Sequence, residues 1–306
     1  NTAGRFPVVI SAPGVTVGGL SGSGNALEPA DFVNGVANLT SLGMTLSTPT
    51  TPVTVQFTAT SADGKTGVSG DVTIQTPPDY FTELFTGSSD PFDLDYRSMI
   101  FIPDGSTDFY AAYCDPITQL PTDPTGGTAL SLTDDSYAAV TLSGGAQVSL
   151  YGVSYSTLYV GSNGYITFGS GDTDYTESLA DHFAFRRIAA LFDDLYPSAG
   201  QVTWKQLADR VAVTFQSVRE YGVTNSNTFQ IEMYFNGRIA VSYLVVDAQD
   251  GLAGLSRGTG LPADFLESNL SAYPQPPGRT LSITAPNGGE AFEVGSMVAV
   301  LWNAHG

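Results

Sequence analysis

Acidic side chains gather at two places where their oxygen atoms could bind a metal ion. Asp90, Asp93 and Asp95 lie within six positions of a turn-rich segment, and Asp193 and Asp194 follow a run of apolar residues. Calcium binds hard oxygen ligands clustered on loops, so both places are candidates for a structural Ca²⁺. The spacing of an EF-hand is absent, however, and Asp is also a common turn former, an alternative that we keep open.

The residue types that nucleophilic catalysis needs are scarce. The chain has two histidines, and His305 lies close to the end of the sequence, so His182 is the one candidate for a catalytic base. No convincing nucleophile elbow of the G-x-S-x-G type is present. Two histidines and the single cysteine, Cys114, cannot build a usual zinc site or an intrachain disulfide. We therefore predict that the chain is not an enzyme and has no cofactor apart from the candidate calcium.

Charge restricts the partners of the chain. It carries 30 acidic and 11 basic side chains, for a net charge of −19. Such a surface repels nucleic acid and anionic membranes. No run approaches the roughly 20 apolar residues that cross a bilayer, so we expect no membrane insertion. A polysaccharide or an extracellular matrix or surface protein is the expected partner. An aromatic patch for sugar stacking could come from Tyr151, Tyr155 and Tyr159.

Short strands joined by turns account for most of the remaining pattern. Only 13% of the residues are charged, which argues against long helices with charged outer faces. Residues 79–277 hold about ten strand candidates, so we predict an antiparallel β-sandwich there. Residues 228–235 and 239–246 flank Asn236 and Gly237, the preferred pair of a type I′ hairpin. A short helix is expected only over 175–183, where Thr176 could be the N-cap. The other strand candidates are 99–102, 137–142, 147–152, 157–160, 165–168, 188–192, 210–218 and 252–255.

Two further segments flank this main domain. Alternating runs at 6–10, 39–46, 53–60 and 68–75 predict a small Ig-like sandwich over residues 1–78. Residues 278–306 hold strand candidates at 280–284 and 297–302, too few to close a sandwich. We expect them to be the truncated start of a further Ig-like module, with Trp302 buried by docking or by pairing with another chain. We also expect Asn1 to be an internal or processed start, because no signal peptide is visible.

Three motifs in a fixed order resemble the nidogen-type extracellular β domain. They are SNGYITFG at residues 162–169, FDDL at 192–195 and FQIEMYFNGRI at 229–239. The resemblance implies an accessory region of the kind found on secreted bacterial subtilisin-like proteases and adhesins. SITAPNGGE at 282–290, followed by Trp302, is similar to the opening of bacterial Ig-like repeats. Neither resemblance brings a catalytic residue.

Together these observations predict a non-catalytic module of a secreted or cell-surface bacterial protein. It would attach or present other domains of the same polyprotein. The alternative is a structural subunit of a surface layer or filament that self-assembles through β-strand contacts.

Overall fold

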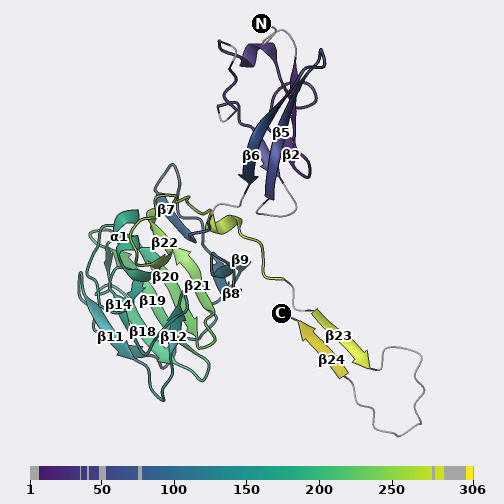
Figure 1. Cartoon of the computed structure of the whole chain (residues 1–306). Helices are drawn as coiled ribbons and strands as arrows, with labels where there is room; N and C mark the ends of the chain where they lie inside the picture. Colours follow the sequence, from purple (N-terminus) through teal and green to yellow (C-terminus); the bar gives the residue numbers. More distant parts are fainter. Residues whose placement is uncertain are drawn as a thin grey trace. The chain divides into compact units, whose positions relative to one another are not determined.

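The computed structural model of the chain describes residues 7–34, 36–39, 41–47, 53–74, 78–277, 280–285 and 301–305, the last two segments by their backbone only. The chain folds as two compact units, Asn1–Pro77 and Pro78–Gly306. Strands dominate both units (Figure 1). The all-β prediction is confirmed.

The second unit is a sandwich of two antiparallel sheets. The first sheet has the order β10-β18-β19-β20-β21-β8-β9, with β17 paired to β19, and the second has the order β11-β14-β15-β16-β22-β7. The strands of the first sheet are β8 (Arg97–Pro103), β9 (Tyr110–Pro116), β10 (Thr128–Ala129), β17 (Leu195–Tyr196), β18 (Gln201–Gln206), β19 (Arg210–Glu220), β20 (Asn227–Tyr234) and β21 (Ile239–Val246). Those of the second are β7 (Thr82–Thr86), β11 (Tyr137–Thr141), β14 (Thr157–Gly161), β15 (Tyr165–Thr167), β16 (Arg186–Phe192) and β22 (Asp250–Arg257). A separate ribbon joins β12 (Val148–Leu150) to β13 (Val153–Tyr155), and a 3-10 turn, η2, spans Leu270–Ala272.

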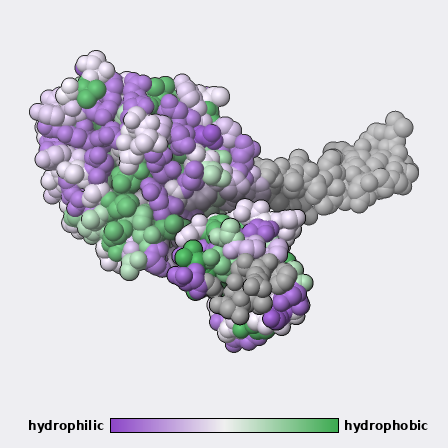
Figure 2. Space-filling view, turned by 90° about the horizontal axis from the view of Figure 1, so that it is seen from above, coloured by the Kyte–Doolittle hydropathy of each residue, from purple (hydrophilic) through white to green (hydrophobic). Residues whose placement is uncertain are grey.

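The core lies between the two sheets because their strands alternate apolar and polar side chains. On β20, Phe229 and Ile231 belong to the main hydrophobic cluster. Gln230, between them, is instead tied by its side chain to Thr122, on a loop that covers the other face. The hydroxyl of Tyr243 on β21 donates across the sandwich to the carbonyl of Ala190 on β16 at 2.8 Å. The larger body in Figure 2 presents mainly hydrophilic residues on its visible face, with smaller hydrophobic patches.

The predicted short helix is present but starts later than expected. Helix α1 (Leu179–Ala184) is capped by Ser178, whose Oγ accepts the backbone N–H of Asp181 at 3.1 Å, so the prediction of Thr176 as N-cap is wrong. The Thr176 backbone N–H instead donates to Asp174 at 3.0 Å.

The hairpin between β20 and β21 forms around Asn236 and Gly237, but not with the predicted turn type. Gly237 is the only residue of this loop with a positive φ, at 91°. A type I′ turn needs positive φ at both central residues. The Gly237 N–H donates to the Tyr234 carbonyl and the Tyr234 N–H donates to that of Arg238, so a three-residue loop with a left-handed glycine closes the hairpin.

The first unit has a four-stranded antiparallel sheet in the order β3-β1-β5-β6 and a two-stranded sheet, β2-β4. A small core gathers Ile10, Leu20 and Leu27. The strand predicted at 39–46 is largely a turn, with only its end in β4. The elements are β1 (Val8–Ser11), β2 (Thr16–Gly18), β3 (Ala26–Leu27), the 3-10 turn η1 (Pro29–Asp31), β4 (Thr45–Ser47), β5 (Val53–Ser61) and β6 (Thr66–Ile74).

Near the end of the chain, β23 (Thr280–Ala285) pairs with β24 (Leu301–His305) as a two-stranded sheet. The side chain of Trp302 and residues 297–300 of the predicted strand lie outside the described residues. The Ig-like character of both flanking segments stays a prediction.

Candidate functional site

The first acidic group predicted from the sequence comprises Asp90, Asp93 and Asp95, and its role as a calcium site stays a prediction. The Asp95 carboxylate accepts the backbone N–H of Val246 at 2.9 Å, and the backbone of Asp90 forms a turn with Gly87. Asp93 is exposed on the surface. Within the described residues, these three carboxylates belong to neither of the two groups of acids whose oxygens converge.

Asp193 belongs to a different and more buried arrangement, which we call the Asp193 cluster: Asp193, Glu220 and Asp250. One carboxylate oxygen of each lies within 4.8 Å of the others. Asp193 follows β16, Glu220 ends β19 and Asp250 begins β22. Asp193 is only 6% exposed; its Oδ1 accepts the backbone N–H of Asp194 at 2.7 Å, whereas its Oδ2 is buried without a hydrogen-bond partner.

The strand pairings explain why these three acids meet. β16 pairs with β22, with an irregular register between Ala189 and Phe192, and Leu195 of β17 pairs with Glu220 of β19. The chain from β16 to β17 therefore passes from one sheet to the other at this corner. Gly251 has φ +116°, and a Cβ there would lie 2.9 Å from the Leu191 side chain and 3.5 Å from the Cβ of Asp193. Glycine permits this close approach.

The charges of the cluster repel one another. Burial, and next the charge of Glu220, raise the pKa of Asp193 to about 8. Burial also raises the pKa of Glu220, although the side chain of Asn225 donates a hydrogen bond to it. None of the ion pairs found in the described part of the chain involves these carboxylates. The cluster holds negative charge without a side-chain counter-ion.

Asp194, the neighbour of Asp193, contributes to a second group with Asp134 and Asp135. Asn163 connects this group to the backbone: its amide donates to Asp135 Oδ1 at 3.0 Å, and its Oδ1 accepts the N–H of Leu195 at 3.1 Å. Burial and the charge of Asp135 raise the pKa of Asp194. The two predicted residues thus serve separate clusters.

Gly164 fixes the SNG turn against β16. It has φ +78°, and a Cβ at this position would lie 1.7 Å from the carbonyl oxygen of Leu191. The Gly164 carbonyl accepts the N–H groups of Ala190 and Leu191 at 3.0 and 3.3 Å. The SNG and FDDL motifs are therefore halves of one structural corner.

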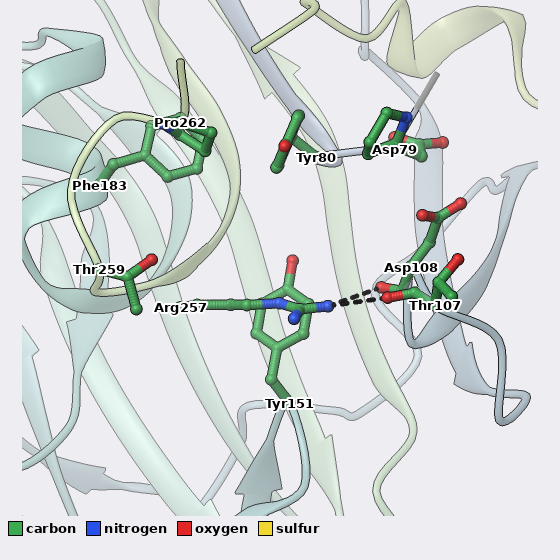
Figure 3. A pocket seen from close by; sticks show the side chains of 10 residues that line it. Asp79, Tyr80, Thr107, Asp108, Tyr151, Phe183, Arg257, Thr259 and Pro262 are labelled. Carbon is green, nitrogen blue, oxygen red and sulfur yellow. Dashed lines mark hydrogen bonds between the residues drawn. The ribbon is translucent and has the colours of Figure 1, made fainter. Parts of the chain in front are cut away.

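A pocket of about 350 Å³ is the second candidate site in the second unit (Figure 3). The guanidinium of Arg257, at the end of β22, lies 4.5 Å from the ring centre of Tyr151. Its Nη2 donates to the carbonyls of Thr107 at 3.2 Å and Asp108 at 3.5 Å. Arginine carries five N–H donors, so donors remain for a ligand. The lining also includes Asp79, Tyr80, Phe183, Thr259 and Pro262.

The two carboxylates of this pocket differ in their availability. Asp79 accepts hydrogen bonds from the Phe81 N–H, the Ser268 hydroxyl and the Tyr273 hydroxyl, at 2.6 to 2.9 Å. The Asp108 side chain, by contrast, makes no hydrogen bond within the described residues, and only its backbone carbonyl accepts one, from Arg257. A bound molecule can therefore meet free donors on Arg257 and free acceptors on Asp108.

Tyr80 gives the pocket an aromatic wall of fixed orientation. Its hydroxyl donates to Asp264 at 2.7 Å, and this hydrogen bond, with burial second, raises the pKa of Tyr80 to about 12. Its ring meets that of Phe183 edge-on, with ring centres 6.2 Å apart. Tyr80 therefore stays neutral at physiological pH.

The predicted aromatic patch is not formed. Tyr151 lines the pocket, whereas Tyr155 packs on Phe168 and Tyr159 packs on Tyr137. The three tyrosines are therefore distributed among separate local contacts, and only Tyr151 remains relevant to binding.

The candidate catalytic residues are inside the fold. His182 is fully buried, with Nε2 3.3 Å from the Thr82 hydroxyl and Nδ1 without a partner. Burial, and next the charge of Arg187, lower the pKa of His182 to about 3. The string GLSRG at residues 254–258 matches G-x-S-x-G, but its Ser256 is buried within β22 and donates to the Phe185 carbonyl at 2.7 Å. An elbow would present this serine between a strand and a helix.

The second unit is an antiparallel β-sandwich domain in which the SNG and FDDL motifs form one corner. The model of the family described as NIDO related matches residues 113–287, more than half of the 306 residues. The chain belongs to this nidogen-related family, whose domains are extracellular-type accessory modules. No curated protein and no solved structure matches the sequence. Within the described residues, no helix has the length and apolar character needed to cross a membrane.

Proposed function

We propose that this chain is a non-catalytic module of a secreted or cell-surface bacterial protein, which attaches or presents other domains of the same polypeptide. Membership of the nidogen-related family supports the extracellular setting. The burial of His182 and Ser256 supports the absence of catalysis, because neither side chain can reach a dissolved substrate. The acidic composition is consistent with a well-solvated surface.

The Arg257 pocket is the proposed attachment site, and the proposed ligand of this pocket is a neutral polysaccharide. The observation that carries this proposal is the pairing of free donors on Arg257 with a free Asp108 carboxylate beside Tyr80. Sugar hydroxyl groups both accept and donate hydrogen bonds, and the C–H face of a sugar ring packs on aromatic side chains. The pocket volume of about 350 Å³ lies within the range of small-ligand sites. A net charge of −19 disfavours polyanions.

Native gels that contain dextran or xylan test this assignment. Retardation of the chain by at least one neutral polysaccharide is expected, with loss in Arg257→Gln and in Asp108→Asn. Arg219→Gln is the matched control, because Arg219 is also exposed on the second unit but lies outside the pocket. Equal retardation of all four proteins, or binding only to collagen-type matrix proteins, would contradict the proposal. Thermal melting of each variant verifies its fold.

A structural role through self-assembly is the second candidate, favoured by β6. This nine-residue strand lies at the edge of the sheet formed by the described strands of the first unit. Val68 and Val72 on it are 62% and 38% exposed. Long exposed edge strands with apolar residues tend to pair with another chain, here a second copy.

Sedimentation velocity over a hundredfold dilution series tests the self-assembly. Concentration-dependent oligomers that disappear in Val68→Lys would support pairing through β6, because a charge on an edge strand opposes such pairing. Monomers at every concentration would exclude this role and leave attachment as the function.

A further inference from the structure

The Asp193 cluster is built like a site for a hard cation, and it shares no residue with the Arg257 pocket. We propose that Asp193, Glu220 and Asp250 bind one calcium ion, which links the two sheets of the sandwich. Only Asp193 was indicated by the sequence motif. Glu220 and Asp250 are 27 and 57 positions further along the chain, and strand pairing brings them to the same corner.

The buried Oδ2 of Asp193 is the observation that distinguishes this cluster from ordinary surface acids. Asp193 is only 6% exposed, and no N–H or hydroxyl group of the described residues donates to this oxygen. A buried ionised carboxylate without a partner is costly, and such groups are normally paired or coordinate a metal. Two more carboxylate oxygens lie within 4.8 Å, a separation that a single ion between them would bridge. A cation therefore supplies the partner that the protein lacks.

The donor set selects calcium. All three ligands are carboxylates, and neither a histidine nor the cysteine belongs to the group, which disfavours zinc. Carboxylates that bind through one or both oxygens suit the flexible six-to-eight coordination of Ca²⁺, whereas Mg²⁺ requires near-ideal octahedral geometry and retains its waters. Asp250 is exposed, so water can complete the coordination shell from that side. Three ionised carboxylates and one Ca²⁺ together carry a net charge of −1.

The ion would act on the fold as a clamp. Asp193 directly follows β16 and Asp250 begins β22, both strands of the second sheet, whereas Glu220 ends β19 of the first. A shared ion therefore joins the two layers where the chain passes from β16 to β17. Affinities of extracellular calcium modules lie near 10⁻⁴–10⁻³ M, so the clamp would be loaded outside cells and empty inside them.

Thermal melting of the chelator-treated full chain tests the site. At a hundredfold excess of Ca²⁺ over its dissociation constant, the melting temperature should rise by about 5–10 °C. MgCl₂ and NaCl at equal ionic strength should produce less than a third of this shift. Equilibrium dialysis with ⁴⁵Ca should lose one bound ion per chain when Asp193 is changed to Asn.

Two further variants keep the proposal falsifiable if Asp193→Asn fails to fold. Asp250→Asn alters an exposed ligand and should abolish the calcium shift without unfolding the chain. Asp93→Asn removes an exposed acid outside the cluster and should retain the full shift. The proposal is overturned if Ca²⁺ gives no shift beyond that of Mg²⁺, or if Asp250→Asn retains it. Loss of the shift only in Asp93→Asn or Asp194→Asn would also overturn it and assign the ion to another group of acids.

Discussion

Replacing His182 by Gln should remove a specific loss of stability in acid. The imidazole is fully buried, and its pKa falls from about 6.5 in the unfolded chain to about 3 in the fold. When the pKa of a base is lower in the folded state than in the unfolded state, its contribution to the free energy of unfolding is fully present above the unfolded pKa, here pH 6.5. This contribution is lost as the pH falls from 6.5 towards 3, because the unfolded chain takes up the proton and the folded chain does not.

The size of the loss follows from the shift. Each pH unit within this window is worth about 1.4 kcal/mol, so between pH 6.5 and pH 4 His182 should lower the free energy of unfolding by about 3 kcal/mol. Glutamine keeps a side-chain amide near the Thr82 hydroxyl but does not titrate. The substitution therefore changes the free energy of unfolding by an amount that does not depend on pH, and it also changes the slope of that free energy against pH.

Urea denaturation at half-unit steps from pH 4 to pH 8, in the presence of chelator, measures both profiles. We expect the two curves to run parallel above pH 7, and the difference between parent and variant to change by about 3 kcal/mol on going down to pH 4. Parallel curves over the whole range would refute the burial of a neutral His182. They would also return this histidine to the list of candidate catalytic bases.

Three test substitutions and one control probe the fold around the sites, each by urea denaturation. Gly164→Ala should lower the free energy of unfolding by more than about 3 kcal/mol, since its Cβ would clash with the β16 backbone. Gly144→Ala is the control, with a similar positive φ and open space, and should lower it by about 1 kcal/mol. Equal losses would contradict the close contact between the SNG turn and β16. Tyr243→Phe should lower the free energy of unfolding by about 1–2 kcal/mol, because it removes a hydrogen bond to a buried carbonyl. An unchanged stability would disprove the link between the sheets. Asp172→Asn should lower the free energy of unfolding by about 3–5 kcal/mol, because it removes the negative charge that pairs with the buried guanidinium of Arg187 at 2.5 Å. A neutral result would exclude that ion pair.

The positions of the strands are the part of the fold that can best be predicted from the sequence. The alternating pattern on β20 and β21 predicts both strands closely, because one face of each lies on the core. The edge strands β7 and β9 were not predicted, since their burial comes from distant strands rather than from a local alternation. The turn type at Gly237 was wrong because the Asn-Gly pair is compatible with more than one loop length.

The candidate sites depended still more on tertiary structure. The FDDL motif indicates Asp193 as a candidate ligand. Its partners Glu220 and Asp250 become neighbours only through the pairing of β16 with β22 and of β17 with β19. The pocket combines Tyr80, Tyr151 and Arg257 from distant parts of the chain, and no local spacing indicates it. The SNG motif carried a signal that could have been used: a glycine after Asn in a strand connection predicts a tight turn.

Hydrogen-exchange mass spectrometry with a neutral oligosaccharide tests the proposed attachment most directly. Peptides that contain Tyr80, the 107–108 segment and the 257–262 segment should become protected together, and this protection should disappear in Arg257→Gln while it persists in Arg219→Gln. Absence of protection with every neutral oligosaccharide, or protection confined to peptides of the first unit, would contradict the assignment of the Arg257 pocket as the binding site.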